Sequence, residues 1–541
     1  MSLMHETAFL PPKMRGFDQL GAQRLDALII GGGITGAGVA RDLALRGVKI
    51  ALVDQGDFAS GTSSGSTKLI HGGLRYLEQF DFGLVFEACR ERRILRQIAP
   101  HLVRPQPLMI PLYRGARRPK ILVHAGMLLY DLLAMFRNTH HHQILSASET
   151  LRRQPLLGER GLTGAALYWD CRMDDARLCL ENVIAAREAG AVTVNYARVT
   201  GLLHRAGRVA GATVEDCETG TTLDVEARVV INAGGPWLDR VGAMSPHWIP
   251  RLRPTRGSHL LVPRLAGGAE ALYLSIDRDD RMFFIIPWGE LSLIGTTDLD
   301  DSNPPEEVAV TAAEIEYLLA ETARYLPGTA LSADDVVSTF AGIRPLLAGR
   351  TGQASAASRE HALFETPDGL IAIGGGKYTT YRAMAAETAD RVMLRLGRPR
   401  GRAQTGRLPL PGGGAAWDEA LRTPSASVHR HGVTTDILQR LTDRYGARTL
   451  HLLSLLDREP ELATPLVPGI DLLGVEVAYA ADFEMARTPE DVLRRRSSLA
   501  LWPGHGSAVV APVADLLGRR LSLSPERLAA AVAAYHLTYT P

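Results

Sequence analysis

Short runs of consecutive apolar residues alternate with a helical pattern near the start of the chain. Residues 27–30 and 50–53 are continuous apolar runs, which are typical of strands buried in a parallel sheet. Between them, Val39 and Leu43 lie four positions apart on one predicted helix face, and Gly47 ends that helix as a left-handed cap. The pattern predicts a strand, a helix and a second strand, the repeating unit of an α/β sheet.

Apolar runs also occur later in the chain, in two different settings. The runs at 229–231 and 370–373 each lead into a glycine cluster, and an alanine-rich helical pattern follows the second. Residues 282–287 and 291–295 instead flank a turn at 288–290, which indicates an antiparallel hairpin. We therefore expect a parallel sheet and an antiparallel sheet whose strands are interleaved along the sequence.

The last part of the chain has a helical period. A linker rich in proline and glycine is expected over 401–414. Beyond it, Ile437, Leu441 and Tyr445 share one predicted helix face. We expect a helical C-terminal domain over 415–541.

Composition places the chain among ordinary globular proteins. It has 541 residues, of which 46% are hydrophobic and 22% charged, which excludes a disordered, collagen-like or disulfide-rich chain. The net charge is +1, so no whole-molecule field attracts nucleic acid and no such partner is expected. The four cysteines form no CxxC pair, which argues against zinc and dithiol chemistry and suits a reducing cytosol.

Two features bear on targeting and metals. No stretch reaches the roughly 18 to 20 uninterrupted apolar residues of a membrane-spanning helix. The N-terminus has no apolar core of the signal-peptide kind, and we interpret residues 1–19 as a polar arm. The run His140-His141-His142 is compatible with a metal site, but an exposed loop is favoured, so no metal is expected.

A glycine-rich turn joins the first predicted strand to its helix. Gly31, Gly33 and Gly36 satisfy the pattern GxGxxG, and Asp54 follows the second strand. In such units the glycines permit a tight turn, close approach to a pyrophosphate and close packing of helix on strand. The helix N-terminus attracts phosphate, and the acid accepts hydrogen bonds from ribose. The unit predicts a dinucleotide site and leaves FAD and NAD open.

A single dinucleotide is expected, because no second complete unit follows. The glycine clusters at 374–376 and 412–414 lack the third glycine and the trailing acid. The segment 58–68 is rich in small hydroxyl side chains, which suit close contact with a flavin or a pyrophosphate.

Several short motifs then occur in a fixed order. They are KLIHGGLRY at 68–76, WDCRMDDARL at 169–178, PTRGSH at 254–259, IPW at 286–288, IGTTD at 294–298, FAGIRPL at 340–346 and GGGKYTTYR at 374–382. Together with the dinucleotide unit they resemble the FAD-dependent, respiratory and quinone-linked glycerol-3-phosphate dehydrogenases of the bacterial aerobic type.

The resemblance implies a fold and a domain plan. It implies a Rossmann-type FAD-binding domain of the glutathione-reductase-like and amino-acid-oxidase-like kind, interleaved with an antiparallel substrate domain and followed by an α-helical C-terminal domain. The implied segments are 20–81, 159–250 and 350–400 for the FAD domain, and 82–158 and 251–349 for the domain of substrate and membrane contact.

The resemblance also implies a reaction. Bound FAD, held non-covalently, would oxidise sn-glycerol 3-phosphate to dihydroxyacetone phosphate, with hydride passing from C2 to flavin N5 and electrons on to a membrane quinone. The implied location is peripheral, on the cytoplasmic side of the inner membrane, and a homodimer is compatible with it.

Motif matches imply the site residues. Those implied to bind the cofactor are Gly31, Gly33, Gly36, Asp54, Ser63, Ser64, Ser66, Lys68, His71, Gly72, Ala233, Gly234, Gly375, Gly376 and Lys377. Those implied to bind the substrate phosphate are Arg75, Tyr76, Arg344, Lys377 and Thr380. His259, Arg344 and Lys377 are implied to be catalytic. The base that takes the C2 hydroxyl proton is expected to be His259, with His71 as the second choice.

One stretch suggests how electrons reach a quinone. The apolar stretch at 121–136 follows four basic residues, Arg114, Arg117, Arg118 and Lys120. Basic residues beside an apolar helix suit binding to anionic lipid without spanning the bilayer. A buried helix of the substrate domain and a dimer face are alternative interpretations of the same pattern.

Three other functions stay open at this point. A glycerol-3-phosphate oxidase would perform the same oxidation and pass its electrons to oxygen. An amine or amino-acid oxidase of the same flavin fold would have no need of Arg75, Arg344 and Lys377. A non-catalytic flavoprotein would bind FAD and act through its C-terminal domain.

Overall fold

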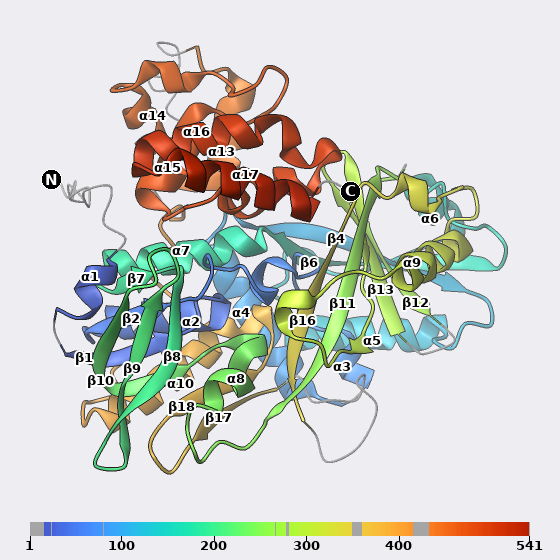
Figure 1. Ribbon diagram of the computed structural model, residues 1–541. Coiled ribbons are helices and arrows are strands. Elements are labelled where there is room, and N and C mark those ends of the chain that lie inside the picture. The colour runs from blue at the N-terminus through green and yellow to red at the C-terminus, as the bar shows by residue number, and fades with distance from the viewer. Residues whose placement is uncertain are drawn as a thin grey trace, which may run out of the picture.

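The computed structural model describes residues 16–22, 24–78, 80–265, 267–276, 281–348, 360–414 and 432–539. Two sheets lie beside each other, and a helical part at the C-terminal end of the chain packs against the molecule above them (Figure 1). Parts of the expected domains lie outside the described residues, namely 1–15 of the N-terminal arm, 350–359 of the FAD segment and 415–431 of the C-terminal domain.

The first sheet contains the predicted parallel strands. Its strands are β1 (Leu25–Ile30), β2 (Ile50–Val53), β7 (Val192–Val194), β8 (Ala197–Arg205), β9 (Arg208–Asp216), β10 (Thr222–Asn232), β17 (His361–Glu365) and β18 (Ile371–Gly375). The order is β17-β18-β10-β1-β2-β7, with β9 pairing β10 and β8 pairing β9. The pairs β1–β2, β1–β10, β10–β18 and β2–β7 are parallel.

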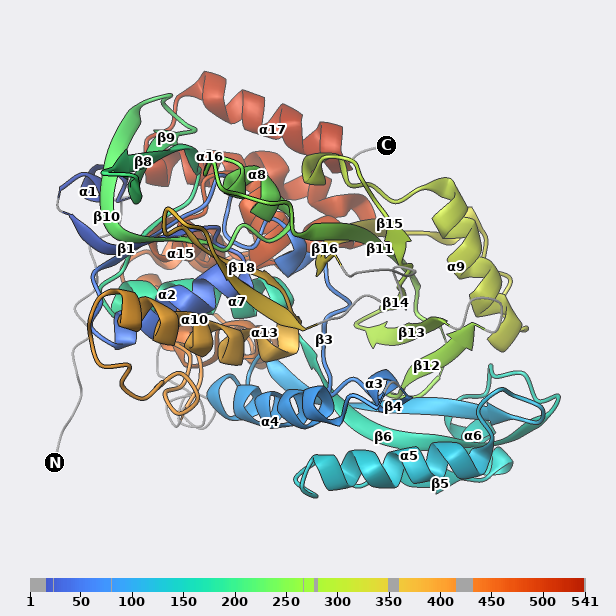
Figure 2. The ribbon, with the colours of Figure 1, turned by 90° about the horizontal axis from the view of Figure 1, so that it is seen from below.

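Both faces of β1 are buried, which explains its continuous apolar run. The helices beside this sheet are α1 (Phe17–Leu20), α2 (Ile34–Leu45), α7 (Asp175–Glu188), α8 (Leu238–Gly242) and α10 (Tyr381–Arg395). Ala27 and Ile29 belong to the core formed with α2, α7 and α10, which lie together in Figure 2. Leu28 and Ile30 belong to the core on the opposite face, because successive strand residues alternate.

The second sheet is the expected antiparallel one. Its strands are β3 (Leu69–Ile70), β4 (Val103–Tyr113), β5 (Gln143–Leu145), β6 (Leu162–Met173), β11 (Leu252–Pro263), β12 (Ala271–Ile276), β13 (Arg281–Trp288), β14 (Leu291–Gly295), β15 (Leu299–Asp300) and β16 (Ser338–Leu347). The order is β15-β11-β14-β13-β12-β4-β6-β3, with β16 beside β11 and β5 beside β6. The predicted hairpin is confirmed, since Trp288 of β13 pairs with Leu291 of β14.

Two strands fall in a different sheet from the one that their sequence segment suggests. β6 lies within 159–250 and β3 within 20–81, both expected in the FAD domain, yet both belong to the second sheet. The reason is pairing at long range. β6 aligns antiparallel with β4 from Met173↔Val103 to Leu162↔Tyr113, and β3 pairs with the far end of β6.

Further helices cover the second sheet. They are α3 (Arg75–Glu78), α4 (Phe82–Ile98), α5 (Lys120–Leu133), α6 (Ala147–Arg153) and α9 (Ala312–Tyr325). α5 lies against β6 at the outer side of this sheet (Figure 2). No helix among the described residues is both long enough and apolar enough to cross a membrane.

The expected helical C-terminal part is confirmed for residues 432–539. Its helices are α13 (Thr435–Tyr445), α14 (Thr449–Leu456), α15 (Gly474–Phe483), a π-helix (Asp491–Arg496), α16 (Val510–Leu521) and α17 (Pro525–Tyr539). They enclose a separate hydrophobic core that includes Leu441 and Tyr445. Trp502 of this part stacks on Trp288 of β13, with ring centroids 5.3 Å apart, so the C-terminal part also touches the second sheet.

Candidate functional site

One cavity of about 660 Å³ lies between the two sheets. The parallel strands β1, β10 and β18 all end at it, with Gly31, Ala233 and Gly375 in its wall. Ligands bind at this edge of open α/β sheets, outside the carboxyl ends of the strands. The opposite wall comes from the second sheet and includes His259 and Arg344.

The glycine-rich turn is packed too tightly for side chains. Gly31 has a φ of +106°, and a Cβ there would lie 2.6 Å from the carbonyl oxygen of Ala233. A Cβ on Gly36 would lie 1.8 Å from the carbonyl oxygen of Gly31. Gly33 precedes the first turn of α2 and lines the cavity together with Gly31, whereas Gly36 lies beneath it. The turn thus exposes backbone N–H groups at a helix N-terminus, as a pyrophosphate requires.

Asp54 follows β2 and lines the cavity. Its two carboxylate oxygens accept backbone N–H groups, from Gly32 at 2.6 Å and from Gly56 at 2.9 Å. Burial raises the pKa of Asp54 to about 6, against these two hydrogen bonds, which lower it. The carboxylate is therefore held rigidly at the strand end where a ribose is expected.

Two of the four expected cofactor residues of the hydroxyl-rich loop line the cavity. Ser63 and Ser66 line it, and the Ser63 hydroxyl accepts the N–H of Ile34 at 2.8 Å. Ser64 and Lys68 are not among the lining residues. The Lys68 ammonium instead forms a buried ion pair of 2.6 Å with Asp175, and the Ser66 hydroxyl donates to the same carboxylate at 2.7 Å.

Of the neighbouring residues His71 and Gly72, only the first lines the cavity. His71 lines the cavity, and its N–H donates to the hydroxyl of Thr379 at 3.2 Å. Gly72 does not line it. A Cβ on Gly72 would lie 2.3 Å from the hydroxyl of Tyr130, so this glycine serves packing behind the cavity wall.

The third glycine cluster reaches the cavity as expected. Gly375 and Gly376 line it with Gly234 from the turn after β10. Lys377 follows directly, and its Nζ lies 3.4 Å from the centroid of the Tyr76 ring. Lys377 and Tyr76 both line the cavity, so a cation and a phenol from separate segments meet there.

Arg344 supplies a second cation, from the wall that the second sheet forms. It stands on β16 and directs its guanidinium to the loop after β14. Its Nη1 donates to a carboxylate oxygen of Asp298 at 2.9 Å, and its Nη2 donates to the hydroxyl of Thr296 at 3.0 Å. These contacts fix the planar fork while one side of the residue still lines the cavity.

His259 is buried and also forms part of the cavity wall. It is 2% exposed on β11, and its Nε2 lies 2.9 Å from the hydroxyl oxygen of Thr67. The imidazole stacks on Phe340 of β16, with centroids 4.8 Å apart. Burial holds the pKa of His259 well below its usual value, and the charges of Arg344 and Lys68 lower it further. The ring is therefore neutral at physiological pH.

Arg75 and Thr380, two of the expected phosphate ligands, do not line the cavity. Arg75 and Tyr76 are adjacent on α3, but only Tyr76 is among the lining residues. Neighbouring helix residues point about 100° apart, so one of the pair faces away. Thr380 is buried, and its hydroxyl donates to the carbonyl oxygen of Lys377 at 3.3 Å. Its place is behind the Lys377 turn.

Some residues of the cavity wall are not predicted from the sequence. Thr67 precedes the KLIHGGLRY motif by one position, and only the fold shows that it faces His259. At the other end of the cavity, Glu306 accepts hydrogen bonds from Trp237 at 2.7 Å and Arg240 at 2.5 Å. The dipeptide Pro236-Trp237 after a glycine cluster was the available signal for this end.

Histidines of the run at 140–142 contact other side chains of the protein. His142 Nδ1 lies 2.8 Å from a carboxylate oxygen of Asp131, and the His140 ring packs on Trp169 with centroids 4.8 Å apart. Within the part of the chain that the structure describes, no group of three or more histidine, cysteine, aspartate or glutamate residues could hold a metal ion.

Comparisons with known proteins match these features. The family model described as FAD dependent oxidoreductase matches residues 26–391, and the one described as C-terminal domain of alpha-glycerophosphate oxidase matches 403–528. A glycerol-3-phosphate dehydrogenase of Synechocystis sp. is 38% identical over 541 residues, which cover 97% of this chain and 98% of that protein.

Solved structures give the same result. The glycerol-3-phosphate dehydrogenase from Bacillus halodurans, complexed with FAD, is 30% identical and superposes with a TM-score of 0.80 over 97% of each chain. The L-alpha-glycerophosphate oxidase from Mycoplasma pneumoniae, with FAD bound, is 17% identical and has a TM-score of 0.55 over 72% of this chain and 99% of its own. The second likeness concerns the fold alone.

These matches settle which dinucleotide the cavity holds. The tight glycine turn, the N-terminus of α2 and Asp54 fit a dinucleotide, and the family model specifies FAD. That model covers more than half of the chain, and the Synechocystis relative covers nearly all of it. The chain therefore belongs to the FAD-dependent oxidoreductases, within the family that includes the bacterial glycerol-3-phosphate dehydrogenases.

Proposed function

We propose that this protein oxidises sn-glycerol 3-phosphate to dihydroxyacetone phosphate with FAD and passes the electrons to a membrane quinone. One observation carries the proposal. The same cavity is lined by the dinucleotide turn and by Lys377, Arg344 and His259. A phosphorylated alcohol held by the two cations would lie next to a bound flavin, and the named relatives support that substrate.

Lys377 and Arg344 are proposed to bind the substrate phosphate. Lys377 offers a compact charge with three donors, and Arg344 offers a planar fork that its partner Asp298 already orients. Tyr76, which also lines the cavity, supplies a neutral hydroxyl. Because the cations are fixed before the substrate arrives, little side-chain entropy is lost on binding.

His259 is proposed to take the proton of the C2 hydroxyl. Its depressed pKa keeps the imidazole unprotonated, so a lone pair is available at neutral pH. The hydrogen bond with Thr67 fixes the ring, and Nδ1 has no hydrogen-bond partner among the described residues. Bound FAD supplies the acceptor for the hydride that leaves C2. His71 lines the same cavity and is the second candidate for the base.

An anaerobic titration tests the proposed substrate. Purified FAD-loaded protein is titrated with sn-glycerol 3-phosphate, without an added acceptor, while the visible flavin absorbance is followed. We expect stoichiometric bleaching, and no bleaching by glycerol at the same concentrations. A flavin that stays oxidised with the phosphorylated substrate would refute the proposal.

The FAD affinity of the cofactor-free protein is expected to depend on Asp54 and on pH. Ribose hydroxyls that donate to Asp54 favour its ionised form, so FAD binding lowers a pKa that is about 6 in the free protein. A proton is then released on binding. Affinity should therefore weaken as the pH falls below about 6, by up to about tenfold per pH unit.

Fluorescence titration of the FAD-free protein across about pH 5 to 8 measures this dependence. The variant Asp54→Asn keeps the shape of the side chain and has no charge to titrate. It should bind FAD more weakly and show no pH dependence in this window. An equal slope in Asp54→Asn and the wild type would assign the effect to another group.

An oxidase is the second candidate function. The match of residues 403–528 to a domain named after alpha-glycerophosphate oxidase favours it. Oxygen uptake with equimolar hydrogen peroxide, in the absence of a quinone, would identify oxygen as the acceptor. Slow reoxidation in air with fast reoxidation by a quinone analogue would identify the dehydrogenase.

The route to a quinone is proposed to be peripheral contact of α5 with the cytoplasmic face of an anionic membrane. Ile121 is 80% exposed, Leu132 56% and Phe136 58%, an unusual display of large apolar side chains on one helix and its end. Arg117 and Lys120 flank them, and both are exposed. This combination suits insertion into the interface beside anionic headgroups.

A small pocket strengthens the proposed membrane face. It has a volume of about 60 Å³ and lies where α4 meets the end of α5. Arg93, Arg96 and Arg137 line it, and none of them forms an ion pair with a residue that the structure describes. The exposed Phe86 and Met135 are in the same lining. Cations without carboxylate partners beside apolar side chains suit lipid phosphates.

The variant Ile121→Glu is expected to weaken binding to vesicles of an anionic phospholipid by about tenfold or more, because it removes an aliphatic side chain that would be buried in the lipid and adds a charge that the lipid repels. Co-sedimentation with such vesicles measures it. Ile249→Glu is the matched control, since Ile249 is 62% exposed in a loop away from α5. Equal binding of the two variants would exclude α5 as the contact.

A further inference from the structure

Three consecutive arginines of the C-terminal part are buried against the cofactor-binding part. Arg494, Arg495 and Arg496 form the end of the π-helix and are 9%, 6% and 3% exposed. Burial of guanidinium groups is costly unless they are paired, so each one requires an explanation from its partners.

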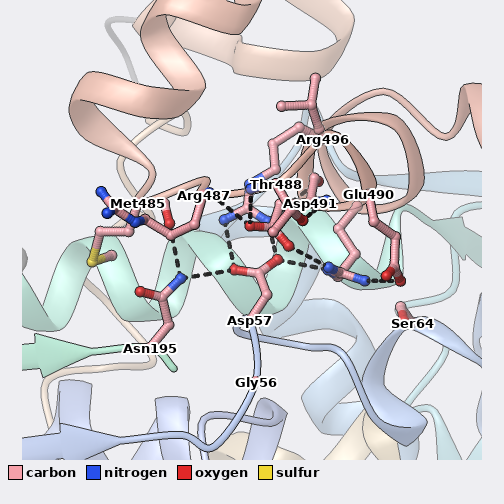
Figure 3. A network of polar contacts seen from close by, with 12 residues as sticks. Gly56, Asp57, Ser64, Asn195, Met485, Arg487, Thr488, Glu490, Asp491 and Arg496 are labelled. Carbon is pink, nitrogen blue, oxygen red and sulfur yellow. Dashed lines mark hydrogen bonds and ion pairs between the residues drawn. The ribbon is translucent and has the colours of Figure 1, made fainter. Parts of the chain in front are cut away.

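The burial of Arg495 and Arg496 is explained by ion pairs with Asp57, which lies three residues after Asp54. Arg495 Nε donates to one oxygen of Asp57 at 2.6 Å, and Arg496 Nη2 donates to the other at 3.0 Å. Asn195 donates to the same carboxylate at 3.2 Å and to the carbonyl oxygen of Met485 at 2.8 Å. Figure 3 shows Asp57 reaching up from the cofactor-binding part into this group. The network docks the π-helix on the loop that follows Asp54.

Arg494 differs from its two neighbours because it has no carboxylate partner among the described residues. Its Nη2 donates to the carbonyl oxygen of Ser64 at 3.1 Å. Its guanidinium carbon lies 5.4 Å from the centroid of the Phe340 ring, within the range of a cation–π interaction. A buried cation is thus held by one backbone carbonyl and one aromatic ring.

These two partners are the supports of His259. Ser64 is in the loop that also carries Thr67, whose hydroxyl oxygen lies 2.9 Å from His259 Nε2. Phe340 stacks on the His259 imidazole with an angle of 13° between the rings. Arg494 therefore contacts both the loop and the ring that fix His259, although it lies in another part of the chain.

From this arrangement we propose that Arg494 is a positioning residue for the oxidation, which holds His259 in place through Phe340 and the Ser64 carbonyl. The proposal rests on the function proposed above. It gives the C-terminal part a role in the reaction, because Asp57 and its arginines fix the helix from which Arg494 reaches the site.

Removing Arg494 should loosen His259 without touching the cations that hold the substrate. In Arg494→Met, kcat is expected to fall by on the order of tenfold to a hundredfold, since small misplacement of a reacting group has effects of this size. The KM for glycerol 3-phosphate should change little. Arg494→Lys should recover much of the rate, because an ammonium can still donate to Ser64 and lie near Phe340. Arg519→Met, at an exposed arginine of α16, should equal the wild type.

A second readout does not need turnover. Acylation of His259 by diethyl pyrocarbonate is followed by mass spectrometry of its peptide in the FAD-free protein. His259 should react several times faster in Arg494→Met than in the wild type and in Arg519→Met, because its supports are loosened. Phe340→Leu should reproduce both effects and serves as the test if Arg494→Met does not fold.

The outcomes separate the two proposals. A wild-type flavin that glycerol 3-phosphate does not reduce would refute the proposed function, while the acylation rates still test the hold of Arg494 on His259. Wild-type acylation and wild-type kcat in Arg494→Met would overturn the positioning role. A lower rate that Arg494→Lys does not restore, with unchanged acylation of His259, would show a merely structural role and overturn it as well.

Discussion

Replacing Lys377 by methionine is expected to lower kcat/KM for sn-glycerol 3-phosphate by on the order of a hundredfold, because a charge-assisted hydrogen bond to the phosphate is worth about 1.5–3 kcal/mol. The change keeps an unbranched side chain that is shorter by one atom, and the glycine turn that precedes it lines the cofactor site. FAD content, measured from the visible absorbance of the purified protein, should therefore stay close to that of the wild type.

The substrate preference should change with the rate. Lys377→Met should lose part of the discrimination between glycerol 3-phosphate and glycerol, because one of the two cations that bind the phosphate is removed while Arg344 remains. Lys49→Met is the matched control, since Lys49 is exposed and does not line the cavity. An amine or amino-acid oxidase would show no special need for Lys377, so wild-type kinetics in Lys377→Met would favour that alternative.

Replacing Gly36 by alanine is expected to abolish FAD binding. The added Cβ would lie 1.8 Å from the carbonyl oxygen of Gly31, which is backbone and cannot rotate away. Either α2 or the glycine turn has to shift, and both form the floor of the cofactor site. We expect purified protein with almost no flavin and a loss of stability of more than about 3 kcal/mol, the upper end for overpacked sites.

Gly126→Ala is the matched control for this change. Gly126 is also in a helix, α5, and a Cβ there has no neighbour within 4 Å. Alanine is the better helix former by up to about 1 kcal/mol, so this variant should be equally or more stable and fully loaded with FAD. Flavin content and thermal unfolding of the two variants measure the contrast. Normal flavin content in Gly36→Ala would mean that the turn tolerates the shift.

The local pattern of the sequence predicts much of the fold. The apolar runs at 27–30 and 50–53 become β1 and β2, and the hairpin β13–β14 forms around its predicted turn. These elements depend on short-range periodicity and turn chemistry, which are visible in a single sequence. The dinucleotide turn is predictable from its local pattern. Gly36 is required by a contact with Gly31 inside one strand–helix unit, whereas the contact of Gly31 with Ala233 is visible only in the structure.

Sheet membership is less predictable. The expected FAD segments at 20–81 and 159–250 contain β3 and β6, which pair within the second sheet. A run of apolar residues identifies a strand but not the strand with which it pairs. Pairing depends on register with residues far away in the chain. The sheet to which β3 and β6 belong therefore follows from pairing at long range and not from their own sequence segments.

By itself the sequence determined which reactive groups the chain carries: one dinucleotide unit, which the resemblance assigns to FAD, the histidine candidate His259 and the cations Arg344 and Lys377. Only the tertiary structure decided which of these groups share a cavity, since it places Tyr76 but not Arg75 in the cavity lining and pairs Lys68 with Asp175. It also decided the place of Arg494, whose run of arginines could equally have been a solvated helix face. The physical reason is common to all of these cases. The direction of a side chain depends on helix phase and strand register, and both are fixed by contacts between distant segments.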